Sequence, residues 1–345
     1  MESFEPAIAE LLSAGIARGA SDIHIEAGQC GFLRVQGELY PYGKQVFSAK
    51  SVQNFFAALT LPEEPSCGGT VQELDFSWSY GERRFRVNAF RQRQGWALAL
   101  RLLPAVIPSM EVLGCPAALY GFLRARTGLL LVTGRTGSGK TSTLAAFLAA
   151  VHQQRAVHII TLEDPVEYLY PPGQSLISQR ELGRDFRSFG GALRSALRED
   201  PDILLVGEIR DEDTLRAALD AGDTGHLVLG SLHTGSAAEA VLRMENLVPA
   251  DEQLQLREQL AMVLSGIFSQ QLLPGQDGKR VCACEVLLAT PAVRNLIRTG
   301  HLQQLSSAML SGRQSGMQTM EMAIQELLQQ GRISKDVASG LVEGR

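Results

Sequence analysis

The sequence has little of what a protein needs to span a membrane or to hold nucleic acid by charge. Its 345 residues carry 32 Lys and Arg against 37 Asp and Glu, so no overall positive field exists. No apolar run reaches the roughly 18 residues that span a bilayer, because Pro108, Glu111 and Pro116 interrupt the best candidate. The acidic N-terminus lacks the positive charge and apolar stretch of a secretory signal. We therefore expect a cytoplasmic protein that does not bind nucleic acid.

Cysteine is also scarce. The five cysteines are odd in number and scattered, which suits a reducing compartment better than a disulfide framework. Cys282 and Cys284 lie two residues apart in an apparent strand, and Cys30, Cys67 and Cys115 supply no second pair beside them. A four-ligand zinc site is therefore not expected, and we interpret the pair as small core residues.

The length exceeds what one hydrophobic core usually organises, so we expect at least two domains. Residues 1–104 are predicted to form a compact α+β domain, with helices near 8–16 and 51–59. Apolar and polar residues alternate in five segments that predict strands: 23–25, 32–35, 75–80, 85–90 and 96–103. Closely spaced prolines over residues 105–116 predict a linker after this domain.

Beyond Gly128 the pattern changes to short apolar runs that alternate with helical stretches. The runs cover 129–133, 158–162, 203–207 and 227–231, and the helical stretches cover 141–153, 189–198 and 213–221. Such runs are typical of parallel strands with helices on both faces of the sheet. The sequence thus predicts a doubly wound α/β domain over residues 117–290, followed by a mostly helical region over 291–345.

A phosphate-binding loop follows the first apolar run. Residues 134–141 read Gly-Arg-Thr-Gly-Ser-Gly-Lys-Thr, which fits the pattern G-x-x-x-x-G-K-[ST] between a strand and a helix. The glycines let backbone N–H groups cradle phosphates, and the following helix offers its positive end to the same charge. Lys140 is expected to reach the β and γ phosphates, and Thr141 to give its hydroxyl to Mg²⁺.

The predicted ligands of this loop are therefore ATP and Mg²⁺. Arg135 adds a second cation beside the loop, for which we favour solvation over a phosphate contact. The predicted nucleotide-binding residues are Gly134, Arg135, Thr136, Gly137, Ser138, Gly139, Lys140, Thr141 and Ser142.

Two carboxylates directly follow later apolar runs. Hydrolysis of ATP needs a group that orients water, and in open α/β sheets such groups lie at the carboxyl ends of strands. Glu163 and Glu208 meet this condition, and both are predicted to be catalytic. Gly207 stands where an ordinary Walker B strand has Asp, so Glu208 is also predicted to hold Mg²⁺ through water. Three other acidic residues are interpreted as turn or capping residues: Asp164, Glu167 and Asp202.

Two histidines bracket the next apolar run. His226 and His233 lie seven residues apart and lack a third ligand, so a metal site is not expected. His233 is at the carboxyl end of the run and is predicted to sense the γ phosphate, whereas His226 lies at the opposite end.

Together these motifs resemble those of the ATPases that power type II secretion and type IV pili. Residues 20–25 resemble the N-terminal signature of that family. Three later segments resemble its further motifs: 162–167 its aspartate box, 204–211 its Walker B motif and 224–234 its histidine box. Residues 292–299, Ala-Val-Arg-Asn-Leu-Ile-Arg-Thr, and 316–320 are similar to motifs of the pilus-retraction subgroup. Thr299 stands where the retraction signature has an acid. The assembly and type II secretion members differ more, since they carry a four-cysteine zinc motif.

The resemblance implies a ring hexamer in which a PAS-like N-terminal domain precedes a RecA-like ATPase domain, with ATP between the two. It implies that Arg86 and Arg101 reach the triphosphate, with Arg84 and Arg93 as further candidates; the alternative is a solvated sheet face. It also implies a motor for pilus retraction and twitching motility. Such a ring docks at the cytoplasmic face of the inner membrane on a platform protein.

Four alternatives remain open at this point. Thr299 allows an accessory retraction ATPase that assists a paralogous ring, and the family also includes pilus-assembly and type II secretion ATPases. A nucleic-acid translocase is disfavoured by the acidic balance and by the lack of interleaved basic and aromatic residues. The last alternative is a nucleotide-dependent scaffold without turnover.

Overall fold

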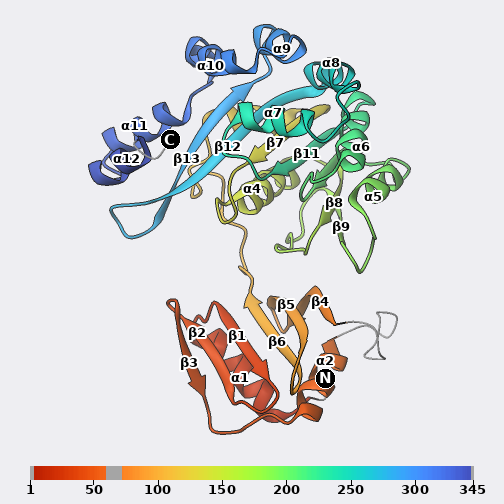
Figure 1. The fold of residues 1–345 in the computed structure, drawn as a ribbon, viewed down its shortest axis with the longest axis vertical. Helices are drawn as coiled ribbons and strands as arrows, with labels where there is room; N and C mark the ends of the chain where they lie inside the picture. Colours follow the sequence, from red (N-terminus) through yellow and green to blue (C-terminus); the bar gives the residue numbers. More distant parts are fainter. Residues whose placement is uncertain (1–3, 60–71, 343–345) are drawn as a thin grey trace. The chain divides into compact units, whose positions relative to one another are not determined.

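The computed structural model describes residues 4–59 and 72–342, and it divides the chain into two compact units (Figure 1). The first unit comprises residues 1–106 together with 164–169 and 183–185. The second comprises residues 107–163, 170–182 and 186–345. In the described part of the chain each unit contains one β-sheet, so the fold is mixed α/β with two sheets.

The first unit is built on an antiparallel six-stranded sheet with the order β3-β2-β1-β6-β5-β4. Its strands are β1 (Asp22–Glu26), β2 (Gly31–Val35), β3 (Glu38–Tyr42), β4 (Glu73–Tyr80), β5 (Arg83–Gln92) and β6 (Gly95–Leu102). Helices α1 (Pro6–Ala17) and α2 (Ala49–Leu59) contribute to the same hydrophobic core as the strands. Along β5, the buried Phe85, Val87 and Ala89 alternate with half-buried polar residues, as expected of a sheet with one solvated face.

Strand β3 is an edge strand that the sequence analysis missed. Within residues 4–59 and 72–342 it pairs only with β2, and its residues are largely exposed, including Leu39 and Tyr40. Pro41 lies within it, opposite Phe32 of β2. Proline and exposed charge are depleted in strands, so this segment lacks the alternation by which the other strands were found.

The second unit contains a seven-stranded sheet with the order β13-β12-β7-β11-β10-β8-β9. Its strands are β7 (Gly128–Thr133), β8 (His158–Glu163), β9 (Leu176–Glu181), β10 (Ile203–Val206), β11 (Leu227–Leu232), β12 (Leu264–Pro274) and β13 (Arg280–Leu288). All neighbours are parallel except β12 and β13, which form an antiparallel pair. The four predicted apolar runs are confirmed as parallel strands.

Helices cover both faces of this sheet. Leu129 and Leu131 of β7 belong to a core shared with α5, α6, α7 and α8, whereas Leu130 and Val132 belong to a core shared with α4. The helices up to β12 are α3 (Ala117–Tyr120), α4 (Lys140–Gln154), α5 (Phe189–Ala196), α6 (Glu212–Asp223), α7 (Ala237–Glu245) and α8 (Gln253–Val263). After β13 come α9 (Pro291–Arg298), α10 (Leu305–Ser311), α11 (Met320–Gln329) and α12 (Lys335–Val342). Short 3-10 helices lie at Gly121–Arg124, Leu302–Gln304 and Arg313–Ser315.

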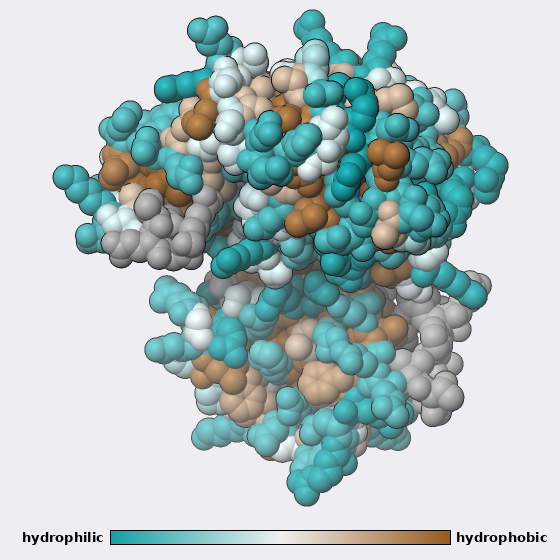
Figure 2. Space-filling view, turned by 45° about the horizontal axis from the view of Figure 1, so that its top comes forward, coloured by the Kyte–Doolittle hydropathy of each residue, from teal (hydrophilic) through white to brown (hydrophobic). Residues whose placement is uncertain are grey.

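The molecular surface and the cysteines can be compared with the sequence predictions. The face drawn in Figure 2 is largely hydrophilic, with apolar side chains in small separate patches. Among residues 4–59 and 72–342, no helix is long and apolar enough to cross a membrane. Cys284 is buried and Cys282 packs beside the same core, while Cys67 lies outside the described residues. Met110, from the segment predicted as a linker, is 3% exposed and belongs to the core of the second unit.

Candidate functional site

The phosphate-binding loop joins β7 to α4, and glycines allow its shape. Gly137 and Gly139 have φ values of 79° and 90°, which L side chains rarely adopt, and Gly139 is the N-cap of α4. A Cβ on Gly134 would lie 2.5 Å from the carbonyl oxygen of Gln270, so this position has no room for a side chain. The loop therefore presents backbone rather than side chains to anything that binds at the N-terminus of α4.

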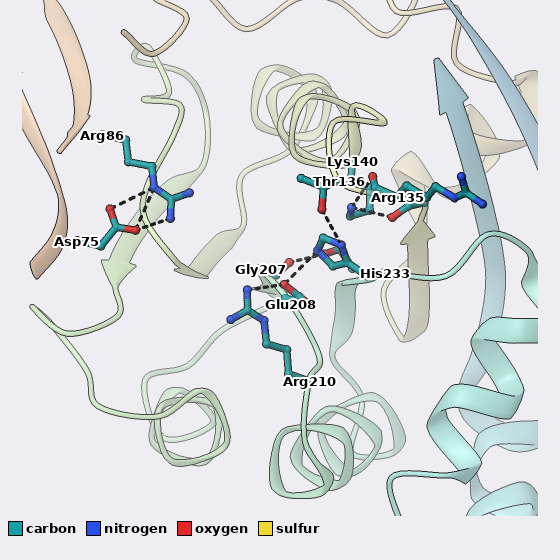
Figure 3. Close-up of polar contacts among 11 residues, drawn as sticks. Asp75, Arg86, Arg135, Thr136, Lys140, Gly207, Glu208, Arg210 and His233 are labelled. Carbon is teal, nitrogen blue, oxygen red and sulfur yellow. Dashed lines mark hydrogen bonds and ion pairs between the residues drawn. The ribbon is translucent and has the colours of Figure 1, made fainter. Parts of the chain in front are cut away.

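Lys140 is held at this loop by the loop itself. Its side chain is mostly buried, and Nζ donates to the carbonyl oxygens of Gly134 (2.9 Å) and Arg135 (3.2 Å). Figure 3 shows both contacts. The hydroxyl of Ser138 is buried and has no hydrogen-bond partner in the described part of the chain. A buried cation, an unpaired hydroxyl and a helix N-terminus that converge on one loop fit a polyphosphate.

The remaining loop residues are more open. Arg135 and Thr136 are exposed. Thr141, the predicted Mg²⁺ ligand, is exposed on the first turn of α4, and Ser142 follows it half-buried. Hydroxyl and carboxylate oxygens are the donors that Mg²⁺ prefers, so Thr141 fits the metal chemically.

Glu208 lies just after β10, between a cation and an imidazole. Its carboxylate is 2.8 Å from Nη2 of Arg210 and 3.2 Å from Nε2 of His233. The backbone around it is fixed to β11, because Ser231 Oγ donates to the carbonyl of Gly207 and the N–H of Ile209 donates to the carbonyl of Ser231. Figure 3 shows Arg210 and His233 converging on this carboxylate from two sides.

His233 connects this carboxylate to the phosphate-binding loop. Its Nδ1 lies 3.4 Å from Oγ1 of Thr136 while its Nε2 faces Glu208. The two contacts use both ring nitrogens, so the position of the ring depends on the loop and on Glu208 together. His226, at the other end of β11, is instead bound to its own turn, with Nδ1 3.0 Å from the carbonyl oxygen of Ala221.

Glu163 occupies a separate, more enclosed place at the end of β8. It is 7% exposed, and Oε1 accepts hydrogen bonds from Thr161 Oγ1 (2.6 Å) and Gln179 Nε2 (3.1 Å). A buried carboxylate with two neutral donors keeps its orientation.

Asp202, read from the sequence as a turn residue, accepts from the backbone N–H of His158 at 2.8 Å.

The predicted arginines of the first unit form ion pairs on their own sheet. Arg86 is bidentate to Asp75, with Nε 3.2 Å and 3.1 Å from the two carboxylate oxygens, and this contact raises the pKa of Arg86. Arg101 Nε lies 2.9 Å from Asp22 Oδ1.

The two further arginine candidates differ from each other. Arg84 Nη2 donates to Ser77 Oγ, so its guanidinium is held by its own sheet. Arg93 follows β5 and is exposed. The side chains of Arg86 and Arg101 are 40% and 68% exposed, so both remain accessible to an anionic ligand.

Three residues that contact the predicted catalytic carboxylates were not predicted from the sequence. Arg210, two residues after Glu208, carried a usable signal, because a cation so close to a predicted catalytic acid can pair with it. Gln179 gave none, since its contact with Glu163 depends on the register between β8 and β9. Thr161 gave none either, because a buried strand residue is read as core.

Comparisons with known proteins extend this description. A family model described as type II/IV secretion system protein matches residues 1–337. The type IV pilus retraction ATPase PilT of Pseudomonas aeruginosa is 42% identical over 332 residues, which cover 96% of this chain and 96% of that protein. The type IV pilus ATPase PilU of the same organism is 35% identical, over 95% of this chain and 87% of that protein.

A solved structure gives the same result in three dimensions. The crystal structure of the pilus retraction motor PilT with bound ADP matches with a TM-score of 0.88 and 40% identity. The match covers 96% of this chain and 95% of that chain. The likeness therefore extends over both units rather than over the phosphate-binding loop alone.

Proposed function

This chain belongs to the family of type II/IV secretion system proteins, and we propose that it is an ATP-hydrolysing motor that drives the retraction of type IV pili. The observation that carries the proposal is the connected site of the second unit. There, His233 contacts both Thr136 of the phosphate-binding loop and Glu208. A group that contacts the nucleotide loop and a carboxylate together can report whether the γ phosphate is present.

In this proposal each residue of the site has one role. The loop backbone and Lys140 bind the β and γ phosphates, and Ser138 donates its unpaired hydroxyl to the same ligand. Glu208 orients the attacking water, and Glu163 is a second candidate for that role. Thr141, together with Glu208 through water, would hold Mg²⁺, which would neutralise charge on the phosphates.

In the proposal, Arg86 and Arg101 leave their present carboxylate partners, Asp75 and Asp22, and bind the triphosphate. Each now contacts a carboxylate on its own sheet, and an exposed ion pair of this kind contributes only about 0–1 kcal/mol to stability. A triphosphate offers more charge than one aspartate and is therefore a competitive partner. Exchange of these contacts between nucleotide states would move the first unit, which we take as the source of force.

The assembly proposed around this cycle is a ring of six copies, each with a PAS-like first unit, a RecA-like second unit and a helical C-terminal region. The ring acts at the cytoplasmic face of the inner membrane on a pilus platform protein. A paralogous retraction ATPase is a further partner. Nucleic acid is not part of the proposal, since the chain has a net charge of −5.

The test is genetic. The gene is deleted from the native host, which then receives either the wild-type chain or Lys140→Ala, and surface pili and surface motility are counted. We expect excess pili without motility in the deletion strain, corrected by the wild-type chain alone. Missing pili would contradict retraction and indicate assembly or secretion.

An accessory retraction ATPase is a second candidate, favoured by Thr299. Thr299 is the C-cap of α9, and its hydroxyl donates to the carbonyl of Asn295 at 2.9 Å, a contact that an acidic side chain cannot make in its charged form. For this candidate we expect the deletion to leave the pilus count unchanged and to weaken retraction under load. Measuring retraction force in the deletion strain separates the two functions.

A further inference from the structure

A buried glutamine of β12 contacts both ends of the phosphate-binding loop. Gln270 is 7% exposed and follows Ser269, which is in register with Thr133, the last residue of β7 before the loop. The hydroxyl of Thr133 donates to Ser269 Oγ at 2.8 Å, so the two strands are joined directly at the start of the loop.

The backbone of Gln270 limits the first residue of the loop. Its carbonyl oxygen is the atom that a Cβ on Gly134 would approach to 2.5 Å. The backbone of β12 therefore packs directly against the residue at which the loop leaves β7.

The side chain of Gln270 reaches the other end of the loop. Its Nε2 donates to Oγ1 of Thr143 at 2.9 Å, and Thr143 lies in the first turn of α4, three residues after Lys140. The same nitrogen donates to Sγ of Cys282 on β13 at 3.3 Å. One residue thus connects the start of the loop, the helix that follows it and the neighbouring strand.

The amide oxygen of Gln270 is buried and has no hydrogen-bond partner in the part of the chain that the structure describes. A buried acceptor without a donor lowers the stability of a fold, and an apolar side chain of similar length would avoid that loss. Stability alone therefore does not account for a glutamine here, whereas the two hydrogen bonds of its NH2 group do.

Resting on the nucleotide site proposed above, we propose that Gln270 is a positioning residue of the phosphate-binding loop. It fixes the first turn of α4 relative to Gly134, so that the loop is preshaped for a polyphosphate. Gln270 does not touch the nucleotide; it acts through Thr143 and through the backbone of the loop.

The experiment compares matched substitutions in the full chain. Gln270→Met keeps the length and removes both hydrogen bonds, and Thr143→Val removes the acceptor while keeping the shape. Thr143→Ser retains the hydroxyl and is the conservative variant. Gln271→Met is the control, because Gln271 is the next residue of β12 and points to the opposite face of the sheet. For each variant we would measure the Kd of ADP by calorimetry, kcat and KM for phosphate release, and the melting temperature without nucleotide.

We expect Gln270→Met and Thr143→Val each to raise the Kd about 3- to 10-fold, the equivalent of one lost hydrogen bond, with little change in kcat. The double variant should be no weaker than Gln270→Met alone, because both substitutions remove the contact between Gln270 and Thr143. Thr143→Ser and Gln271→Met should bind like the wild type, and the melting temperature of Gln270→Met should equal or exceed that of the wild type.

Three results would overturn the proposal. The first is an unchanged Kd in Gln270→Met, the second is a raised Kd that accompanies a lower melting temperature in both Gln270→Met and Thr143→Val, and the third is additive effects in the double variant. A wild-type chain that binds ADP but retracts no pili would contradict the proposed function alone, because the comparison of affinities would still decide the role of Gln270.

Discussion

The two sheets of this molecule hold their charged residues in opposite ways. In the first unit, charged side chains alternate with buried ones along β5, and they pair across the solvated face, as Arg86 does with Asp75. In the second unit, β7, β10 and β11 are buried along their whole length, and ionisable side chains appear only where the strands end. Glu208 and His233 both lie at such ends.

The difference follows from how many faces of each sheet are covered. A sheet with one wet face can carry charge anywhere along its strands, so the position of a charge there says little about function. A sheet covered on both faces can carry charge only at its edges and strand ends, and polar groups from several strands then meet at one place. Charge in the second sheet is therefore the better guide to a site, and the substitutions below test that contrast.

The largest effect is expected at Lys140. Lys140→Ala removes the buried ammonium that stands beside the loop carbonyls, so ATP turnover should fall at least about 10³-fold because the developing phosphate charge loses its nearest cation. Phosphate release and nucleotide binding are the measurements. Lys279→Ala, at an exposed position of the β12–β13 turn, is the matched control and should behave like the wild type.

Arg86 tests whether the first sheet is more than a solvated face. If Arg86 reaches the triphosphate, Arg86→Ala should lower kcat about 10³-fold, as loss of an arginine finger does. Asp75→Ala breaks the same ion pair but keeps the arginine, so it should retain turnover. Equal and small effects of the two substitutions would mean that the charges along β5 serve solvation only.

Glu208→Gln should slow phosphate release about 100-fold while ATP still binds, because the amide keeps the shape but loses the charge that orients water. Glu163→Gln is the comparison at the neighbouring strand end. Its two neutral donors, Thr161 and Gln179, remain available to an amide oxygen. Wild-type rates in Glu208→Gln would remove Glu208 from the catalytic assignment.

The smallest effect concerns pH and Asp22. Burial raises the pKa of Asp22, but hydrogen bonds from Arg101 and Ser21 and the charge of Arg101 outweigh it, so the pKa lies below the ordinary 3.8. A depressed pKa in the folded state stabilises the fold above pH 3.8, and this contribution is lost as the pH falls through the folded-state value. Denaturant unfolding at decreasing pH should therefore show a steeper loss of stability for the wild type than for Asp22→Asn. Parallel curves for the two chains would contradict this.

What could be predicted from the sequence depended on how local the signal was. The phosphate-binding loop is eight consecutive residues between a strand and a helix, so its residues could be named individually. The mostly apolar strands β7, β8, β10 and β11 were predicted for the same reason. Strand β12 was missed, because Ser269, Gln270 and Gln271 interrupt its apolar pattern.

The contacts that complete the site were harder to predict from the sequence. Gln270 and Thr143 lie 127 residues apart, and Gln179 reaches Glu163 only through the register of β8 and β9. Such pairs depend on the order of strands in the sheet, which the periodicity of one sequence does not contain. His233 was named because it follows a strand, but its contact with Thr136 could be seen only in the structure.

Edge strand β3 has a consequence for the behaviour of the purified protein at high concentration. An open strand that exposes Leu39 and Tyr40 can recruit a like strand from another molecule and begin aggregation. Pro41 removes one backbone donor from that strand and so interrupts any continuous ladder of intermolecular hydrogen bonds. Pro41, which made β3 hard to predict from the sequence, thus also helps to prevent association between neighbouring molecules.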